Sequence, residues 1–206
     1  MAGTTRGRID KRQAILEAAF TVFARQGYAQ ACVAEVATEA GVAKPTVYNH
    51  FGEKANLFRE AMTAEAAKAI AENLDAVERL RDAGEDLRTA LEQVGRRLID
   101  CYTDDRSWAF RRLLQAELSR FPELLDTVQS RAGTNRVTDA LADRLGRLAL
   151  DGRLKITDPT RAAEQFGALL TAPLESRTRL GTRALPSSER DGVAAAAVDT
   201  FLLAYG

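Results

Sequence analysis

The stretch 32–51, CVAEVATEAGVAKPTVYNHF, constrains the fold of this chain more than any other. Its apolar residues recur at three- and four-residue spacing as far as Ala40, which is typical of a short helix with one apolar face. Gly41 ends that helix, because glycine tolerates the left-handed backbone found at helix ends. Pro45 then favours a new helix, since proline is well suited to a first helical turn. The stretch therefore predicts a helix, a tight turn and a second helix.

The second helix has two different sides. Val47 and Phe51 are four residues apart and predict its buried side. The other side carries short polar donors, a cation and an aromatic hydroxyl, which suits a helix that enters a DNA major groove about 12 Å wide. The alternative is a plain packing corner between two helices. With the start of the following helix included, the expected DNA-binding residues are Lys44, Pro45, Thr46, Tyr48, Asn49, His50 and Lys54.

These residues have different expected roles. We expect Tyr48, His50 and Lys54 mainly to bind phosphates, and Lys44, Thr46 and Asn49 to face bases. Lys54 lies in the first turn of the next helix, where free backbone N–H groups also favour an anion.

Residues 27–58, GYAQACVAEVATEAGVAKPTVYNHFGEKANLF, resemble the DNA-binding segment of TetR-family transcriptional repressors. The run AELSRFPEL at 116–124 resembles a regulatory-domain segment of family members similar to efflux-pump repressors. The resemblance implies an all-α fold with a three-helix DNA-binding head over residues 1–53, its helix-turn-helix at 32–51. A helical bundle for ligand binding and dimerisation would follow over 54–206. The matching elements are Gly27-Tyr28, Val36-Ala37, Ala40-Gly41-Val42, the run 44–48, His50-Phe51, Lys54 and Leu57.

Four positions depart from the family's usual pattern. Ala31 and Cys32 stand where Thr and Ser are common, Ala43 replaces a common Ser, and Ala55 a common Glu. The first three changes remove side-chain oxygens near helix starts, where a capping oxygen contributes about 0.5–2 kcal/mol. We expect them to affect DNA affinity and not the fold. Cys32 itself has two interpretations, a redox-sensitive thiol at a helix N-terminus or a small apolar replacement for a capping Ser.

Composition gives the remaining bounds. The chain has 206 residues, 46% of them hydrophobic, which is enough for a full core. Its net charge is zero, so an affinity for DNA has to come from the local placement of charge. Residues 1–10 include Arg6 and Arg8 and have no helical pattern. They are interpreted either as a solvated tail or as a minor-groove arm.

Several function classes lack support in the sequence. We expect no membrane association and a cytoplasmic protein, because no apolar run of about 18 residues and no signal segment is visible. Cys32 and Cys101 are expected to be ordinary buried thiols and not to form a disulfide. With one His and no Cys cluster we expect no metal or cofactor, and without a set of nucleophile, base and acid we expect no catalytic residues and no enzyme.

Apolar periodicity predicts further helices along the chain. Pro173 should kink or end the helix that contains it. The expected ranges are 11–26, about 54–75, 86–102, 108–120, 123–149, 158–177 and 189–205.

An apolar wall with few charges is expected inside the helical body, where it would bind a small hydrophobic effector. The alternative is that the same side chains simply fill the core. Glu117 either selects a cationic group or pairs with a nearby Arg. The candidate ligand-binding residues are Leu91, Val94, Leu98, Tyr102, Trp108, Phe110, Leu114, Glu117 and Phe166.

A homodimer is expected, because two recognition helices read two half-sites of a palindromic operator. The last two predicted helices have apolar sides, and the alanines at 194–197 would allow close approach in a four-helix interface. The alternative is that these sides pack only within their own chain. The candidate interface residues are Ala163, Phe166, Leu170, Leu174, Ala194, Val198, Phe201 and Leu202.

The combined hypothesis is a ligand-responsive repressor that binds operator DNA as a homodimer and is released by a small hydrophobic effector. Such release requires the effector to bind one of two conformations more tightly. One alternative is a constitutive DNA-binding dimer without an effector. Another is a helical small-molecule-binding protein that no longer binds DNA.

Overall fold

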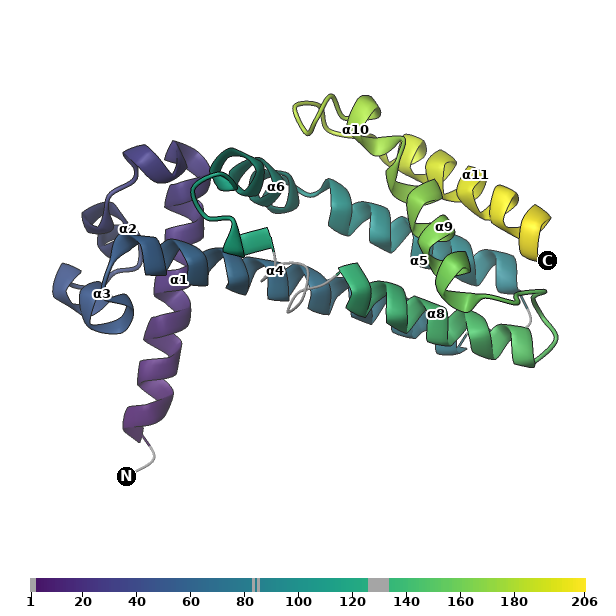
Figure 1. The fold of residues 1–206 in the computed structure, drawn as a ribbon, viewed down its shortest axis with the longest axis horizontal. Coiled ribbons are helices and arrows are strands. Elements are labelled where there is room, and N and C mark those ends of the chain that lie inside the picture. The colour runs from purple at the N-terminus through teal and green to yellow at the C-terminus, as the bar shows by residue number, and fades with distance from the viewer. Residues whose placement is uncertain (1–2, 83, 85, 126–133) are drawn as a thin grey trace. The chain divides into compact units, whose positions relative to one another are not determined.

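The computed structural model describes residues 3–82, 84, 86–125 and 134–206, and in these residues the regular structure is entirely helical (Figure 1). This confirms the all-α expectation. The elements are α1 (Gly3–Gln30), α2 (Val33–Glu39), α3 (Lys44–Phe51), α4 (Lys54–Glu78), the 3-10 helix η1 (Arg79–Asp82), α5 (Leu87–Thr103), α6 (Asp105–Glu117), α8 (Thr134–Leu150), α9 (Pro159–Thr171), α10 (Leu174–Arg177) and α11 (Ser187–Tyr205).

The described residues form two compact units, each with its own apolar core. The first unit contains the residues up to Lys68 and then those from Ala109 to 125. The second contains Ala69–Trp108 and the residues from 134 onward. The predicted division at residue 53/54 therefore differs from the observed grouping. Both α4 and α6 contribute residues to each unit, and apolar side chains of α4 enter both cores.

The core of the first unit is built on the apolar side of α1. Ile15, Ala19 and Val22 are fully buried there and are joined by Val36 of α2 and Val47 of α3. Helix α2 packs against both α1 and α3. The three-helix arrangement that the sequence predicts is thus held by one continuous apolar cluster.

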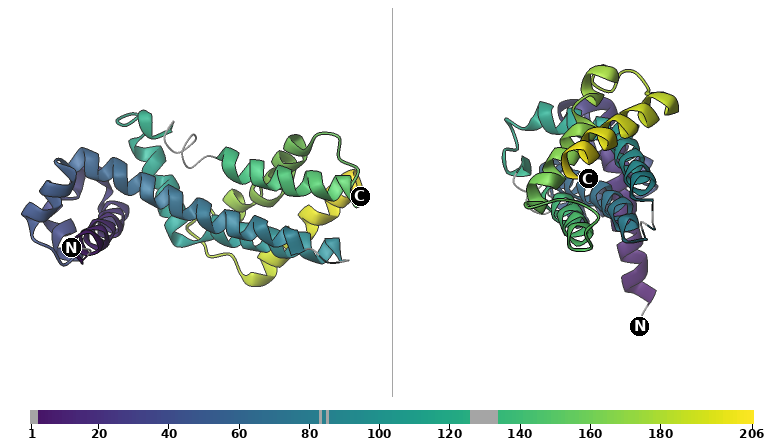
Figure 2. Two further views of the ribbon diagram at one scale, coloured as in Figure 1. Left: turned by 90° about the horizontal axis from the view of Figure 1, so that it is seen from below. Right: turned by 90° about the vertical axis from the view of Figure 1, so that its right-hand side faces the viewer.

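The core of the second unit lies between α5, α8, α9 and α11. Helix α9 packs against α8, α11 and α5, and α11 packs along α5. Figure 2 shows the helices of the chain from two further sides. Gly95 of α5 permits this closeness, because a Cβ added there would lie 3.0 Å from Leu170 Cδ2 and 3.6 Å from Ala194 Cβ.

Several helix bounds differ from those that the sequence predicts. Helix α1 begins at Gly3 and not at Lys11, so residues 3–10 continue the helix. Of the helix expected over 123–149, residues 126–133 lie outside the described residues, and α8 supplies the part from Thr134. The expected interruption at Pro173 is confirmed, since it separates α9 from α10.

Candidate DNA-binding surface and regulatory residues

Backbone hydrogen bonds fix the turn between α2 and α3. Gly41 has φ = 64°, in the left-handed region. The Val42 N–H donates to Ala37 O at 2.9 Å and the Gly41 N–H donates to Thr38 O at 3.1 Å. This pair is the Schellman pattern that closes a helix on a glycine. The predicted role of Gly41 is confirmed, and the turn sets the direction in which α3 leaves.

Helix α3 presents its polar side to solvent. Val47 and Phe51 are buried in the core of the first unit. Lys44, Pro45 and Asn49 are exposed, Tyr48 retains 43% of its surface, and Thr46 and His50 are half-buried. Lys44 Nζ lies 5.8 Å from the centroid of the Tyr48 ring. The structure therefore groups the predicted residues of this helix on one accessible face.

Helices α2 and α3 both lack a side-chain oxygen at the N-cap position. Those positions are Cys32 for α2 and Ala43 for α3. Glu35 partly compensates in α2, because its carboxylate accepts from the Cys32 N–H at 3.3 Å. Hydrogen bonds lower the pKa of Glu35, first from the Gln26 side chain at 3.1 Å and then from Cys32. The start of α2 is thus stabilised by an acidic residue in its first turn.

Lys54 has structural partners beside its predicted role. Its Nζ donates to Ala29 O, at the end of α1, at 3.2 Å. The same Nζ lies 4.6 Å from the centroid of the Tyr28 ring. An ammonium group has three donors, so the Ala29 bond leaves donors for a phosphate. Lys54 therefore joins the end of α1 to the start of α4, shortly after α3 ends.

The candidate effector residues are divided between the two units. Leu91, Val94 and Phe166 are fully buried in the second core, where Leu98 and Tyr102 are partly buried. The Tyr102 and Trp108 rings meet edge to face at 5.8 Å. Phe110 and Leu114 instead pack on the core of the first unit, and Glu117 ends α6 there. The nine candidates therefore belong to two different units.

The candidate interface residues are also placed differently from the prediction. Seven of the eight, all except Leu202, are at most 2% exposed within the single chain. Phe166 and Phe201, for example, meet at 5.0 Å. The apolar sides of α9 and α11 face α5 and α8, so these residues hold their own chain together. The outward side of α11 carries Gly192, Ala196, Thr200 and Leu203.

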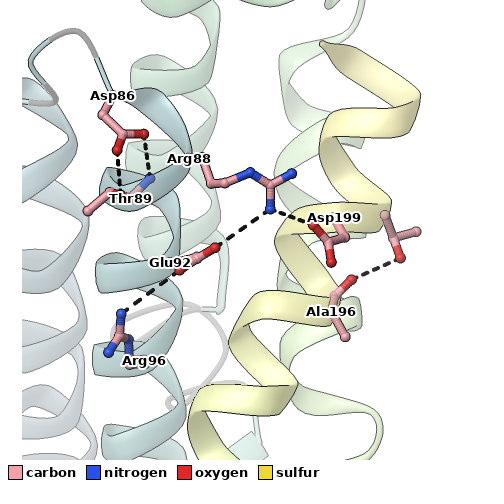
Figure 3. A network of polar contacts seen from close by, with 8 residues as sticks. Asp86, Arg88, Thr89, Glu92, Arg96, Ala196 and Asp199 are labelled. Atoms are coloured by element: carbon pink, nitrogen blue, oxygen red, sulfur yellow. Dashed lines mark hydrogen bonds and ion pairs between the residues drawn. The ribbon is translucent and has the colours of Figure 1, made fainter.

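Charged side chains join α5 to α11 along the surface. Arg88 pairs with Asp199, Arg96 with Asp191 at 3.6 Å, and Asp100 with Arg190 at 3.0 Å. Figure 3 shows Glu92 between Arg88 and Arg96, which it contacts along the same helix. Exposed pairs of this kind contribute little stability one at a time. Repeated along two antiparallel helices, they favour one register.

Asp86 and Cys101 lie near the two ends of α5. The Asp86 carboxylate caps the helix by accepting from Thr89 N at 3.0 Å and from the Thr89 hydroxyl at 2.6 Å. The hydroxyl bond is the main reason that the pKa of Asp86 lies below its ordinary value. Burial, and then the negative charge of Glu72, raises the pKa of the half-buried Cys101 thiol to about 11.

Sequence reasoning did not identify the packing of the segment after α6. Phe121 is buried in the first unit against Tyr28 and Phe58, with ring centroids 4.9 and 5.1 Å apart. The resemblance of the run AELSRFPEL predicts a place in the regulatory body. No periodic signal connects Phe121 to an aromatic cluster so far away in the chain, so only the tertiary structure reveals the contact.

The described residues also bear on membrane association and metal binding. None of the helices there combines the length and the apolar character that a membrane crossing requires. In the same part of the chain, no group of three or more His, Cys, Asp or Glu side chains is arranged to hold a metal ion.

Comparison with known proteins gives a consistent result. Residues 15–61 match the family described as bacterial regulatory proteins of the tetR family. Residues 89–206, more than half of the chain, match the C-terminal domain of AefR-like transcriptional repressors.

Three individual proteins show the same relationship. A TetR-family transcriptional regulator from Mesorhizobium loti MAFF303099 is 28% identical, with a TM-score of 0.89 over 97% of this chain and 98% of that one. The flavonoid-responsive regulator FrrA is 26% identical, with a TM-score of 0.70 over 95% and 97%. The HTH-type transcriptional activator FasR of Mycolicibacterium smegmatis is 29% identical over 140 residues, which span 68% of this chain and 61% of that relative. Together with the helix-turn-helix geometry, these matches show that the chain belongs to the TetR family of transcriptional regulators.

Proposed function

We propose that this regulator is a cytoplasmic repressor that binds palindromic operator DNA as a homodimer and is released by a small hydrophobic effector. The observation that carries the proposal is the accessible polar face of α3, which a buried Val47 and Phe51 hold in a fixed orientation. No catalytic role is proposed for any residue. The relative FasR is named an activator, so activation of transcription is the second candidate.

Duplex selection from genomic DNA tests the DNA-binding role. Bound fragments should share an inverted repeat, and Asn49→Ala should abolish their enrichment, because Asn49 is one of the residues assigned to base edges. Gln115→Ala is the matched control, since Gln115 is an exposed amide on α6. A promoter–reporter assay with the selected site distinguishes a repressor from an activator. Failure to enrich any duplex would refute DNA binding.

We place the dimer contact on the outward sides of α9 and α11. Ala168, Ala196, Thr200 and Leu203 are exposed there, and Leu203 retains 90% of its surface. Small residues let partner helices approach closely, and an exposed leucine supplies apolar area. Because the other seven candidate residues are buried within the single chain, we propose this surface in their place and retain Leu202, which is half-buried.

Sedimentation of charged variants tests this surface. The double variant Ala196→Arg with Leu203→Glu should be monomeric and should bind operator DNA far more weakly than wild type. Leu150→Glu is the control, because Leu150 is 88% exposed at the end of α8 and stands outside the proposed contact. A double variant that still sediments as a dimer would move the interface to another surface.

The effector site is proposed near Leu98, Tyr102 and Trp108 of the second unit. These are the candidate residues of that unit that form neither its fully buried aliphatic centre nor its Phe166–Phe201 contact. The aromatic pair Tyr102–Trp108 suits a ligand with aromatic rings, and the relative FrrA is named flavonoid-responsive. Trp108 is the single tryptophan of the chain, so binding of a flavonoid panel should change its fluorescence and raise the melting temperature. If no compound does either, the site assignment fails.

A further inference from the structure

The segment that follows α6 completes the core of the DNA-binding unit. Phe121 is 3% exposed and Leu124 is 1% exposed, and both belong to the apolar cluster built on α1. The Phe121 N–H donates to Glu117 O at 2.9 Å, so a hydrogen-bonded turn leads from α6 directly to this ring. The first unit therefore depends on a segment remote in sequence from its helix-turn-helix.

Phe121 closes a cluster of four aromatic rings. It meets Tyr28 at 4.9 Å and Phe58 at 5.1 Å, while Phe23 and Phe58 meet edge to face at 5.0 Å. Tyr28 follows Gly27, whose φ of 74° breaks the helical path of α1. Edge-to-face aromatic pairs restrict ring orientation. The Tyr28 ring, and the backbone turn that carries it, are thus fixed in part by Phe121.

Two cationic side chains, Arg120 and Lys54, contact the Tyr28 ring. The Arg120 guanidinium carbon and the Lys54 Nζ each lie 4.6 Å from the Tyr28 ring centroid. Lys54 also donates to Ala29 O, which immediately follows Tyr28. A cation within about 6 Å of an aromatic face is attracted to it. Lys54 is therefore positioned by Tyr28, and Tyr28 is in contact with both Arg120 and Phe121.

We propose that Arg120 and Phe121 are positioning residues for DNA binding, which act by fixing Tyr28 and, through it, Lys54 and the junction between α1 and α2. The inference rests on the proposed function, because it assumes that the protein binds DNA. It extends the residues that matter for binding beyond α3. Arg59 reinforces the arrangement, with its guanidinium carbon 5.0 Å from the Phe121 ring centroid and its Nε donating to Glu123 at 2.6 Å. The turn after α6 is in this way fastened to the start of α4.

The arrangement also gives α6 a route to the DNA-binding residues. Helix α6 is continuous from Trp108, which belongs to the second unit, to Ala109 and onward in the first. A displacement of its last turn would move Arg120 and Phe121 and therefore change the environment of Tyr28. The position of Lys54 would then change with the position of α6.

Binding of the full-length protein to a selected genomic duplex provides the test. Arg120→Gln should weaken binding about two- to five-fold, the range expected for loss of one exposed cation–π contact. Arg112→Gln is the matched control, because Arg112 is an exposed arginine of α6 and carries the same charge. Arg120→Lys, which restores a cation, should recover most of the affinity. A double-mutant cycle should show that Arg120→Gln has little further effect in a Lys54→Gln background.

Two results would overturn the inference. One is an equal effect of the glutamine substitutions at Arg120 and Arg112, which would indicate a general charge effect. The other is an effect of Arg120→Gln that persists undiminished in the Lys54→Gln background, which would show that Arg120 does not act through Lys54.

Hydrogen exchange of the free protein separates this inference from DNA binding itself. Amides of Ala31 and of the first turn of α2 should exchange faster in Arg120→Gln than in wild type or in Arg112→Gln, because the α1–α2 junction loses a restraint. Unchanged exchange would refute the positioning role. If wild type enriches no duplex, the proposed function fails while the exchange result still decides the positioning.

Discussion

The loop that follows α10 allows a sharp test of packing in the second unit. Arg179, Leu180 and Gly181 have φ values of 50°, 57° and 78°, so three successive residues adopt the left-handed conformation. Thr178, buried beneath them, donates from its hydroxyl to Leu174 O at 2.7 Å and accepts from Gly181 N at 3.1 Å. A Cβ added at Gly181 would lie 2.9 Å from Trp108 Cβ and closer still to two ring atoms.

Gly181→Ala should therefore destabilise the second unit through two effects. The left-handed backbone costs a residue with a Cβ about 1–2 kcal/mol, and forcing a methyl group against a packed ring costs about 1–3 kcal/mol. The sum is about 2–5 kcal/mol. For a chain of this size, a central value of about 3 kcal/mol corresponds to a melting temperature about 6–12 °C lower.

Leu180→Gly is the control within the same loop. Leu180 is 63% exposed, so its replacement removes left-handed strain and little packing, while the glycine adds freedom to the unfolded chain. The two contributions nearly cancel, so the free energy of unfolding should stay within about 1 kcal/mol of wild type. Urea unfolding followed by the fluorescence of Trp108 monitors this contact directly. Equal midpoints for Gly181→Ala and wild type, or an equal loss in both variants, would refute the argument.

Three further predictions concern charge and thiol chemistry. Lys54→Ala should lower the salt dependence of DNA binding by about one unit of slope. The control Lys68→Ala removes an exposed lysine later in α4 and should leave the slope unchanged. Equal slopes in both variants would contradict a phosphate contact by Lys54. The pKa of Asp86 in the folded protein is depressed. Its contribution to stability should therefore be present at neutral pH and be lost as pH falls through that lowered pKa, so that Asp86→Ala no longer destabilises the protein in acid. A difference in unfolding midpoint that stays constant across pH would exclude this cap. Iodoacetamide at pH 8 should modify the exposed Cys32 well before Cys101. The pKa of Cys101 is raised to about 11, so its thiolate fraction at that pH is about one in a thousand. Equal rates of modification, measured by peptide mass spectrometry, would contradict the burial of Cys101.

Sequence alone determined the features that depend on neighbours in the chain. The turn at Gly41, the helix start at Pro45 and the buried positions of Val47 and Phe51 follow from local backbone preference and from helical period, and the structure confirms each of them. The same local logic predicted the break at Pro173. The resemblance of residues 27–58 supplied the family, which the comparisons then showed.

Tertiary structure decided what the apolar and cationic side chains contact. Helical period shows that α9 and α11 each have an apolar side, but it does not tell whether that side faces its own chain or a partner, and in the single chain it faces α5 and α8. Period also does not reveal that Phe110 and Phe121 pack in the apolar core of the first unit, where the structure places them. The position of Lys54 on the Tyr28 ring depends on contacts between residues far apart in sequence. Such contacts form only when the chain folds, because no local preference links Arg120 to Tyr28.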